Sequence, residues 1–351
     1  MNRLLSLAAG ATMALGALAE HADAQVRVIS INPDGTIAAP DKDTEVDLGA
    51  SNLNVWRSFR AEECLHVAEE PTSDAEHFYD RLRTTISSMP LGAQLVADLQ
   101  DSDLTLCEGT VQHDDNTSLY YHAGFEAMVI PRSFPSIPEE LRRGYQIMGT
   151  LHEMRHGWQD HLGLTVDHTE LDQQGYIAQT YAMEADASAF AVAASWQMMT
   201  TQGDADAWNY LQRDQYYAPV AAAFEQGLAD AGYDADSDAQ PTAAQLSQAM
   251  QAAYQSWFDD TPLPRIYHER VVEHLGALPL TTTDADGHRE SLLGRFDTVT
   301  ERAALGDTPR ADSYFGDQQA ALAVSETLRR IPIVAAGKEA RADQQPSIRI
   351  P

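Results

Sequence analysis

The sequence predicts an α+β protein that is mostly helical, with a small sheet placed ahead of two long helices. Apolar residues recur at helical spacing through most of the chain, but residues 103–131 change to the pattern of strands. Segment 104–107 predicts one strand, and segments 119–122 and 125–130 predict a hairpin. After residue 203 the pattern predicts helices alone, so the sheet belongs to the first part of the chain.

The N-terminus has the pattern of an export signal. A short positive segment, residues 1–3, precedes an apolar stretch at residues 4–19, and sites with small residues follow it. We therefore expect residues 1–24 to be a cleaved signal peptide and the protein to be exported, either periplasmic or secreted. The apolar stretch is short for a membrane span and contains Gly10 and Gly16, so we expect no stable membrane association.

The amino-acid composition limits the kinds of partner that the protein can bind. The chain of 351 residues has 53 acidic and 23 basic side chains, which gives a formal net charge of −30. The negative electrostatic field of such a charge repels nucleic acid and anionic lipid, so we expect no nucleic-acid partner. The two cysteines, Cys64 and Cys107, predict one disulfide in an oxidising compartment, and two free buried thiols are the alternative.

The rest of the chain divides into segments by pattern. Residues 51–90 carry the first helices, because a capping box at Ser73 and Glu76 opens a helix that reaches about Met89. A short helix at 93–99 follows, and later helices are expected at 136–162, 171–201, 205–230, 242–258, 264–276 and 317–330. The expected domains are an exposed lead-in (25–50), a core (51–203), a helical C-terminal region (204–335) and a disordered tail (336–351).

The pattern that organises the chain is His152-Glu153-Met154-Arg155-His156. Two histidines four residues apart on a helix project from one face, so both can bind one Zn²⁺. Glu153 between them can reach a water on that ion and act as a general base. Tyr145 and Met148 precede the histidines at helical spacing, so the pair extends a buried stripe. A helix that carries two histidines by coincidence is the alternative.

A catalytic zinc needs a third protein ligand and an open position. The best candidate is Glu184, because it lies in the middle of the next helix, which can return antiparallel beside the histidines. Asp186 is an alternative ligand if the register differs, and otherwise it is expected to be a partner of a ligand or a solvated side chain. His161, Asp167 and His168 lie nearby, but no metzincin spacing follows His156.

This arrangement resembles a known group of enzymes. An HExxH helix followed by a helix with Glu184-Ala185-x-Ala187-x-x-Phe190-Ala191 resembles the gluzincin branch of the zincin metallopeptidases. The sequence of the second helix is similar to that of ImmA/IrrE-type metallopeptidases. The hairpin also matches the zincin plan, in which an edge strand lines the cleft above the active-site helix. The resemblance covers about residues 100–200. It implies His152, His156 and Glu184 as zinc ligands, Glu153 as general base, and a peptide or protein substrate.

The sequence leaves other residue roles open. The donor that stabilises the oxyanion has three candidates, Tyr176, Tyr267 and His268. Trp158 and Gln159 are expected to pack or to line the cleft. The alternative function is a non-catalytic module on a zincin-like scaffold that binds a metal or a partner. A Glu153→Gln change separates the two functions, because it removes the base and leaves the ligands.

Overall fold

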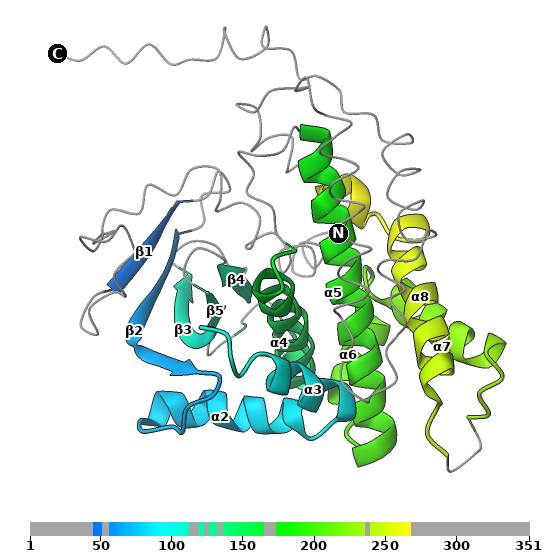
Figure 1. Ribbon diagram of the computed structural model, residues 1–351, viewed down its shortest axis with the longest axis horizontal. Coiled ribbons are helices and arrows are strands. Elements are labelled where there is room, and N and C mark those ends of the chain that lie inside the picture. Colours follow the sequence, from blue (N-terminus) through cyan, green and yellow to red (C-terminus); the bar gives the residue numbers. More distant parts are fainter. Residues whose placement is uncertain are drawn as a thin grey trace, which may run out of the picture.

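The structure is a computed structural model in which a small sheet lies beside a group of helices (Figure 1). The α+β, mostly helical class is confirmed. The structure describes residues 45–50, 56–111, 119–122, 126–131, 134, 137–164, 173–235 and 239–267. The expected signal peptide, most of the lead-in, the helix at 317–330 and the tail from 336 lie outside these ranges.

The sheet has five strands: β1 (Glu45–Ala50), β2 (Trp56–His66), β3 (Thr105–Val111), β4 (Tyr120–His122) and β5 (Ala127–Ile130). Their spatial order is β1-β2-β3-β5-β4. β3 and β5 are parallel, and the other neighbours are antiparallel. The predicted β4–β5 hairpin is therefore confirmed, and β4 forms an edge of the sheet.

A disulfide joins β2 to β3. Cys64 and Cys107 are register partners on these strands, and their sulfur atoms are bonded. The predicted disulfide is confirmed. The first helices do lie within residues 51–90, but the sequence pattern does not predict β2 ahead of them, because its charged sequence shows no clear alternation of apolar and polar residues. Pairing with both β1 and β3 gives this segment its strand conformation.

Two helices follow β2 at one end of the sheet. In α2 (Asp74–Ser87) the predicted capping box is present, because the Ser73 side chain accepts from the Glu76 backbone N–H and the Glu76 carboxylate accepts from the Ser73 backbone N–H. The next helix, α3 (Pro90–Asp98), begins three residues earlier than the sequence predicts. Pro90 lies in the first turn of α3, where its missing N–H has no partner within the helix to lose.

Two long helices pass beside the sheet. α4 (Glu139–His161) packs against β4 and β5, and α5 (Gln173–Gln202) packs against α4 (Figure 1). Gly163 follows α4 with a φ of 67°, and Gly203 follows α5 with a φ of 72°. Glycine adopts this left-handed conformation at little cost, so both helices stop where the sequence predicts.

Three further helices follow α5: α6 (Asp206–Arg213), α7 (Ala218–Asp230) and α8 (Ala243–Asp259). A single helix at 205–230 is therefore wrong. The break lies at Asp214, whose carboxylate accepts hydrogen bonds from the backbone N–H groups of Tyr216 and Tyr217. Pro219 in the first turn of α7 is the sequence signal of this restart. Residues 263–267 form a further helical turn, where the sequence predicts a helix from 264.

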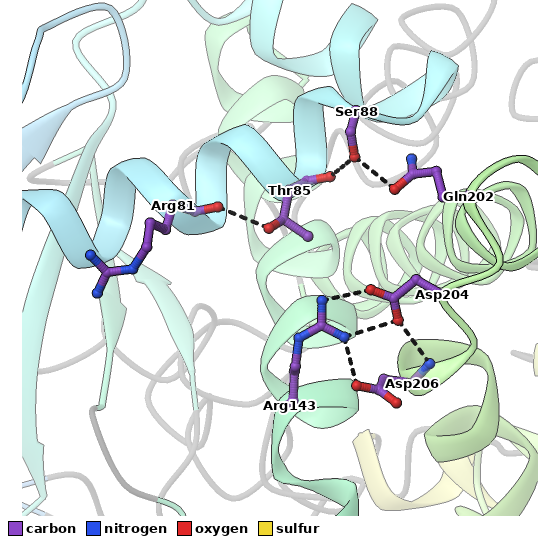
Figure 2. Close-up of polar contacts among 7 residues, drawn as sticks. All are labelled: Arg81, Thr85, Ser88, Arg143, Gln202, Asp204 and Asp206. Atoms are coloured by element: carbon purple, nitrogen blue, oxygen red, sulfur yellow. Dashed lines mark hydrogen bonds and ion pairs between the residues drawn. The ribbon is translucent and has the colours of Figure 1, made fainter.

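The start of α4 is fastened to the start of α6. Figure 2 shows Arg143 between two carboxylates, with a pair of bonds of 2.9 and 2.6 Å to Asp204 and one of 2.6 Å to Asp206. The adjacent Gly144 permits this approach, because a Cβ there would lie 2.1 Å from the backbone oxygen of Asp206. α4 and α6 thus meet backbone to backbone, with no room for a side chain.

One large hydrophobic cluster of the described residues extends from the sheet to Tyr267. It includes Leu106 of β3, Trp158 of α4, Phe190 of α5, Trp257 of α8 and Tyr267. The helices after residue 204 therefore share a core with α4 and α5. Among the described residues, no helix combines the length and the apolar character that crossing a bilayer requires.

Candidate metal centre

His152 and His156 lie one turn apart on the buried face of α4. Their exposed fractions are 1% and 3%, and their Nε2 atoms are 3.1 Å apart. The rings meet edge to face, with centroids 4.8 Å apart. Both Nε2 atoms therefore point at one place, as the HExxH spacing predicts.

Glu184 completes the group from the middle of α5. Its Oε2 lies 3.2 Å from Nε2 of His152, and its Oε1 lies 3.4 Å from Nε2 of His156. One ligand atom from each of the three residues lies within 4.8 Å of the others. The structure thus brings together the three residues that the sequence predicts as ligands.

These residues fit a divalent metal ion. Zinc binds histidine nitrogen and carboxylate oxygen at about 2.0–2.2 Å, so two ligands of a tetrahedral site are about 3.3 Å apart. The observed separations of 3.1, 3.2 and 3.4 Å are close to that value. Two imidazoles and a carboxylate supply three of the four ligands that zinc usually takes.

The charges within the group are strongly coupled. Burial by itself raises the pKa of Glu184, but the charge of His156 and the hydrogen bond with His152 hold it below its usual value. Burial by itself lowers the pKa of His156, but the charge and hydrogen bond of Glu184 raise it to about 9. Burial dominates at His152 and lowers its pKa. An ionised carboxylate buried between two imidazoles favours a positive charge at this place, and a metal ion supplies one.

Glu153 lies beside the group and is held by the edge strand. It is fully buried, and its Oε2 accepts a hydrogen bond of 2.9 Å from the backbone N–H of Tyr121 in β4. Glu153 is the neighbour of His152 in α4, and its negative charge contributes to the raised pKa of His156. The hairpin ahead of the HExxH helix therefore positions the residue that the sequence predicts as general base.

Two tyrosines approach the group from the later helices. The hydroxyl of Tyr267 donates to Oε2 of Glu184 over 2.9 Å, and the ring of Tyr217 lies edge to face with His152, with centroids 6.5 Å apart. Burial and the charge of Glu184 raise the pKa of both tyrosines well above the usual value, so both hydroxyls keep their protons. Of the three predicted oxyanion donors, Tyr267 is the one placed here. The side chains of Tyr176 and His268 lie outside the described residues.

The geometry agrees with a comparison of the whole chain with known families. Residues 59–281 match the model of a family described as "Putative metallopeptidase family (DUF6782)". The chain belongs to this metallopeptidase family. The match contains most of β2, the strands β3 to β5, both long helices and all of α6 to α8. No curated protein and no solved structure matches the chain.

Asp186 is not one of the three metal-binding residues. It binds Gln159, the residue that contacts His156. Its carboxylate accepts from Nε and Nη2 of Arg155 over 2.8 and 3.1 Å, and from Nε2 of Gln159 over 2.6 Å. Gln159 in turn contacts His156, a role that the expected packing of its side chain does not predict. Its position three residues after His156, one turn along the same face, is the signal in the sequence. Tyr217 has no comparable signal. Asp167 and His168 lie outside the described residues.

Proposed function

We propose that the protein is a zinc-dependent metallopeptidase in which His152, His156 and Glu184 hold the ion and Glu153 is the general base. The observation that carries the proposal is the convergence of three buried ligand atoms within 4.8 Å of one another, with Glu153 beside them. Membership in a metallopeptidase family implies a peptide or protein substrate. Zinc is the metal proposed because two imidazoles and one carboxylate are a common ligand set of catalytic zinc.

A zinc ion bound there would supply a Lewis acid that polarises the peptide carbonyl and brings the pKa of water to about 7. Glu153 would take the proton of the attacking water and deliver it to the leaving amine. The backbone N–H of Tyr121 holds one oxygen of that carboxylate over 2.9 Å. This bond fixes the orientation of the Glu153 carboxylate beside the metal-binding group.

Tyr267 is proposed as the donor that stabilises negative charge on the carbonyl oxygen. Its hydroxyl lies 2.9 Å from a carboxylate oxygen of Glu184, so it is already beside the place where the substrate would meet the metal. A protonated hydroxyl in a buried site is an effective donor to such a charge.

Export remains part of the proposal. The disulfide between Cys64 and Cys107 supports an oxidising compartment, such as the periplasm or the outside of the cell, in agreement with the pattern of residues 1–24.

The test compares Glu153→Gln with Glu140→Gln, a matched change in the exposed first turn of α4. Each protein is dialysed against zinc, its metal content is measured, and hydrolysis of a peptide library is followed by mass spectrometry. We expect about one zinc per chain in all three proteins, and turnover lower by about 10²-fold or more in Glu153→Gln alone. Equal turnover in Glu153→Gln overturns the general base. Zinc binding without hydrolysis in the parent favours the alternative, a non-catalytic metal-binding module.

A further inference from the structure

Arg155, Gln159 and Asp186 form a polar network directly behind the metal-binding group. We propose that this network positions His156, by holding its proton on Nδ1 and leaving Nε2 free to bind the metal. The inference rests on the proposed function, because it concerns how one of its ligands is prepared. None of the three side chains belongs to the group that could hold the ion, so their role is exerted through His156.

The orientation of the Gln159 amide follows from its partners. Its Nε2 donates to the backbone oxygen of Met183 over 3.0 Å and to Oδ2 of Asp186 over 2.6 Å. A carbonyl oxygen and an ion-paired carboxylate only accept hydrogen bonds, so the amide nitrogen must lie on that side. The amide oxygen then faces the histidine, with Oε1 of Gln159 2.8 Å from Nδ1 of His156.

The tautomer of His156 follows from the same step. An amide oxygen cannot donate, so Nδ1 of His156 must carry the hydrogen in this contact. In the metal-bound state the imidazole would be neutral, with its proton on Nδ1 and the lone pair of Nε2 directed at the ion. That atom is the one that lies 3.1 Å from Nε2 of His152 and 3.4 Å from Oε1 of Glu184. The hydrogen bond thus also fixes the rotation of the ring about its axis.

Asp186 is itself held in place by Arg155. The guanidinium makes two bonds to the carboxylate and lies over the ring of Trp158, with Cζ 3.6 Å from the ring centroid. The side chains of Arg155 and Asp186 are buried, with exposed fractions of 5% and 0%. Arg155 is the fourth residue of the HExxH pattern, so a position that the motif leaves variable is used in this chain to anchor α4 to α5.

The two histidines differ in this support. Nδ1 of His152 is buried and has no hydrogen-bond partner among the residues that the structure describes. His156 is therefore the ligand whose ring direction is fixed by a side chain. The network also joins the helix of the histidines to the helix of Glu184, so it sets the distance between the ligands that these helices provide.

The test uses Gln159→Leu, with Gln197→Leu as matched control. Gln197 is a buried glutamine of α5 whose Oε1 accepts from the backbone N–H of Leu91, away from the metal-binding group. The Kd for zinc is measured by competition with a chromophoric chelator. We expect Gln159→Leu to bind zinc about 10- to 100-fold more weakly than the parent, and Gln197→Leu to bind it within about threefold.

A second measurement needs no variant. Long-range ¹H–¹⁵N correlation spectra of the zinc-loaded parent report which ring nitrogen of His156 carries the proton, and we expect Nδ1. A proton on Nε2, or an unchanged Kd in Gln159→Leu, overturns the positioning role while the proposed metallopeptidase stands. A parent and a control that both fail to bind zinc overturn the proposed function and this inference together.

Discussion

The hydroxyl of Tyr267 donates a hydrogen bond of 2.9 Å to Oε2 of Glu184, although the two residues are 83 positions apart in the chain. The contact joins the last described turn of the chain to the middle of α5. It means that the part of the chain after α8 takes part in the candidate metal centre. Tyr267 can be tested separately from the ligands, because a phenylalanine keeps its ring and removes only the hydroxyl.

We expect Tyr267→Phe to lower kcat by about 10²-fold, because it removes a donor to the charge on the carbonyl oxygen. The loss of one hydrogen bond to Glu184 is worth about 1 kcal/mol, or about fivefold in the Kd for zinc. Tyr181→Phe is the control, because the Tyr181 hydroxyl is buried without a hydrogen-bond partner among the described residues. Steady-state hydrolysis and chelator competition separate the two effects. An unchanged kcat in Tyr267→Phe would contradict the proposal that Tyr267 donates to the carbonyl oxygen.

The contact between α4 and α6 can be tested at two glycines of α4. In Gly144→Ala the new Cβ would fall 2.1 Å from the backbone oxygen of Asp206, whereas in Gly157→Ala it would fall 3.3 Å from Cδ2 of Leu104. A leucine methyl can shift, but a backbone oxygen moves only with its helix. We expect Gly144→Ala to lower the free energy of unfolding by about 1–3 kcal/mol or more, and Gly157→Ala to change it by less than about 1 kcal/mol. Urea denaturation measures both, and equal losses would contradict the close approach.

Burial raises the pKa of Asp214, although hydrogen bonds from Tyr216, Tyr210 and Tyr217 oppose the shift. The folded chain therefore binds this proton more tightly than the unfolded chain. The contribution of Asp214 to stability is fully present below its unfolded pKa and is lost as the pH rises through the folded pKa. Relative to the parent, Asp214→Asn should thus be more stable at about pH 7 than at about pH 4. Denaturant curves of both proteins at the two pH values test the sign, and the opposite trend would refute the raised pKa.

The disulfide between Cys64 and Cys107 closes a loop across a sequence separation of 43 residues. On the chain-entropy model, such a closure stabilises the folded state by about 4 kcal/mol. We expect the double change Cys64→Ser and Cys107→Ser to lower the free energy of unfolding by about that amount. The parent unfolded in the presence of a reductant should show the same loss. Identical unfolding with and without reductant would show that the bond does not form in solution.

The features that could be predicted from the sequence are those with a local signal. The HExxH spacing places His152 and His156 on one face of a helix wherever that helix lies in a fold. Glu184 lies in the middle of the next helix, so an antiparallel pairing of the two helices brings it beside the histidines. The capping box at Ser73 and the glycine at position 163 likewise mark helix ends through their own backbone chemistry. Such features depend on residues within one or two turns of each other.

The features that could not be predicted depend on distant partners. β2 is a strand because β1 and β3 pair with it, and its own sequence shows no strand pattern. Tyr217 is the N-cap residue of α7, and its contact with His152 depends on the break in the chain at Asp214, between α6 and α7. Gln159 meets Asp186 across the α4–α5 interface, and no spacing along the chain encodes that contact.

The burial of the metal-binding side chains has a kinetic consequence. His152, His156 and Glu184 have exposed fractions of 1%, 3% and 0%, so neither a hydrated ion nor a chelator can touch them in this conformation. Loading and loss of the metal must each wait for an opening motion of the helices around the group. At high chelator concentration, the rate of metal removal should therefore level off at the rate of opening.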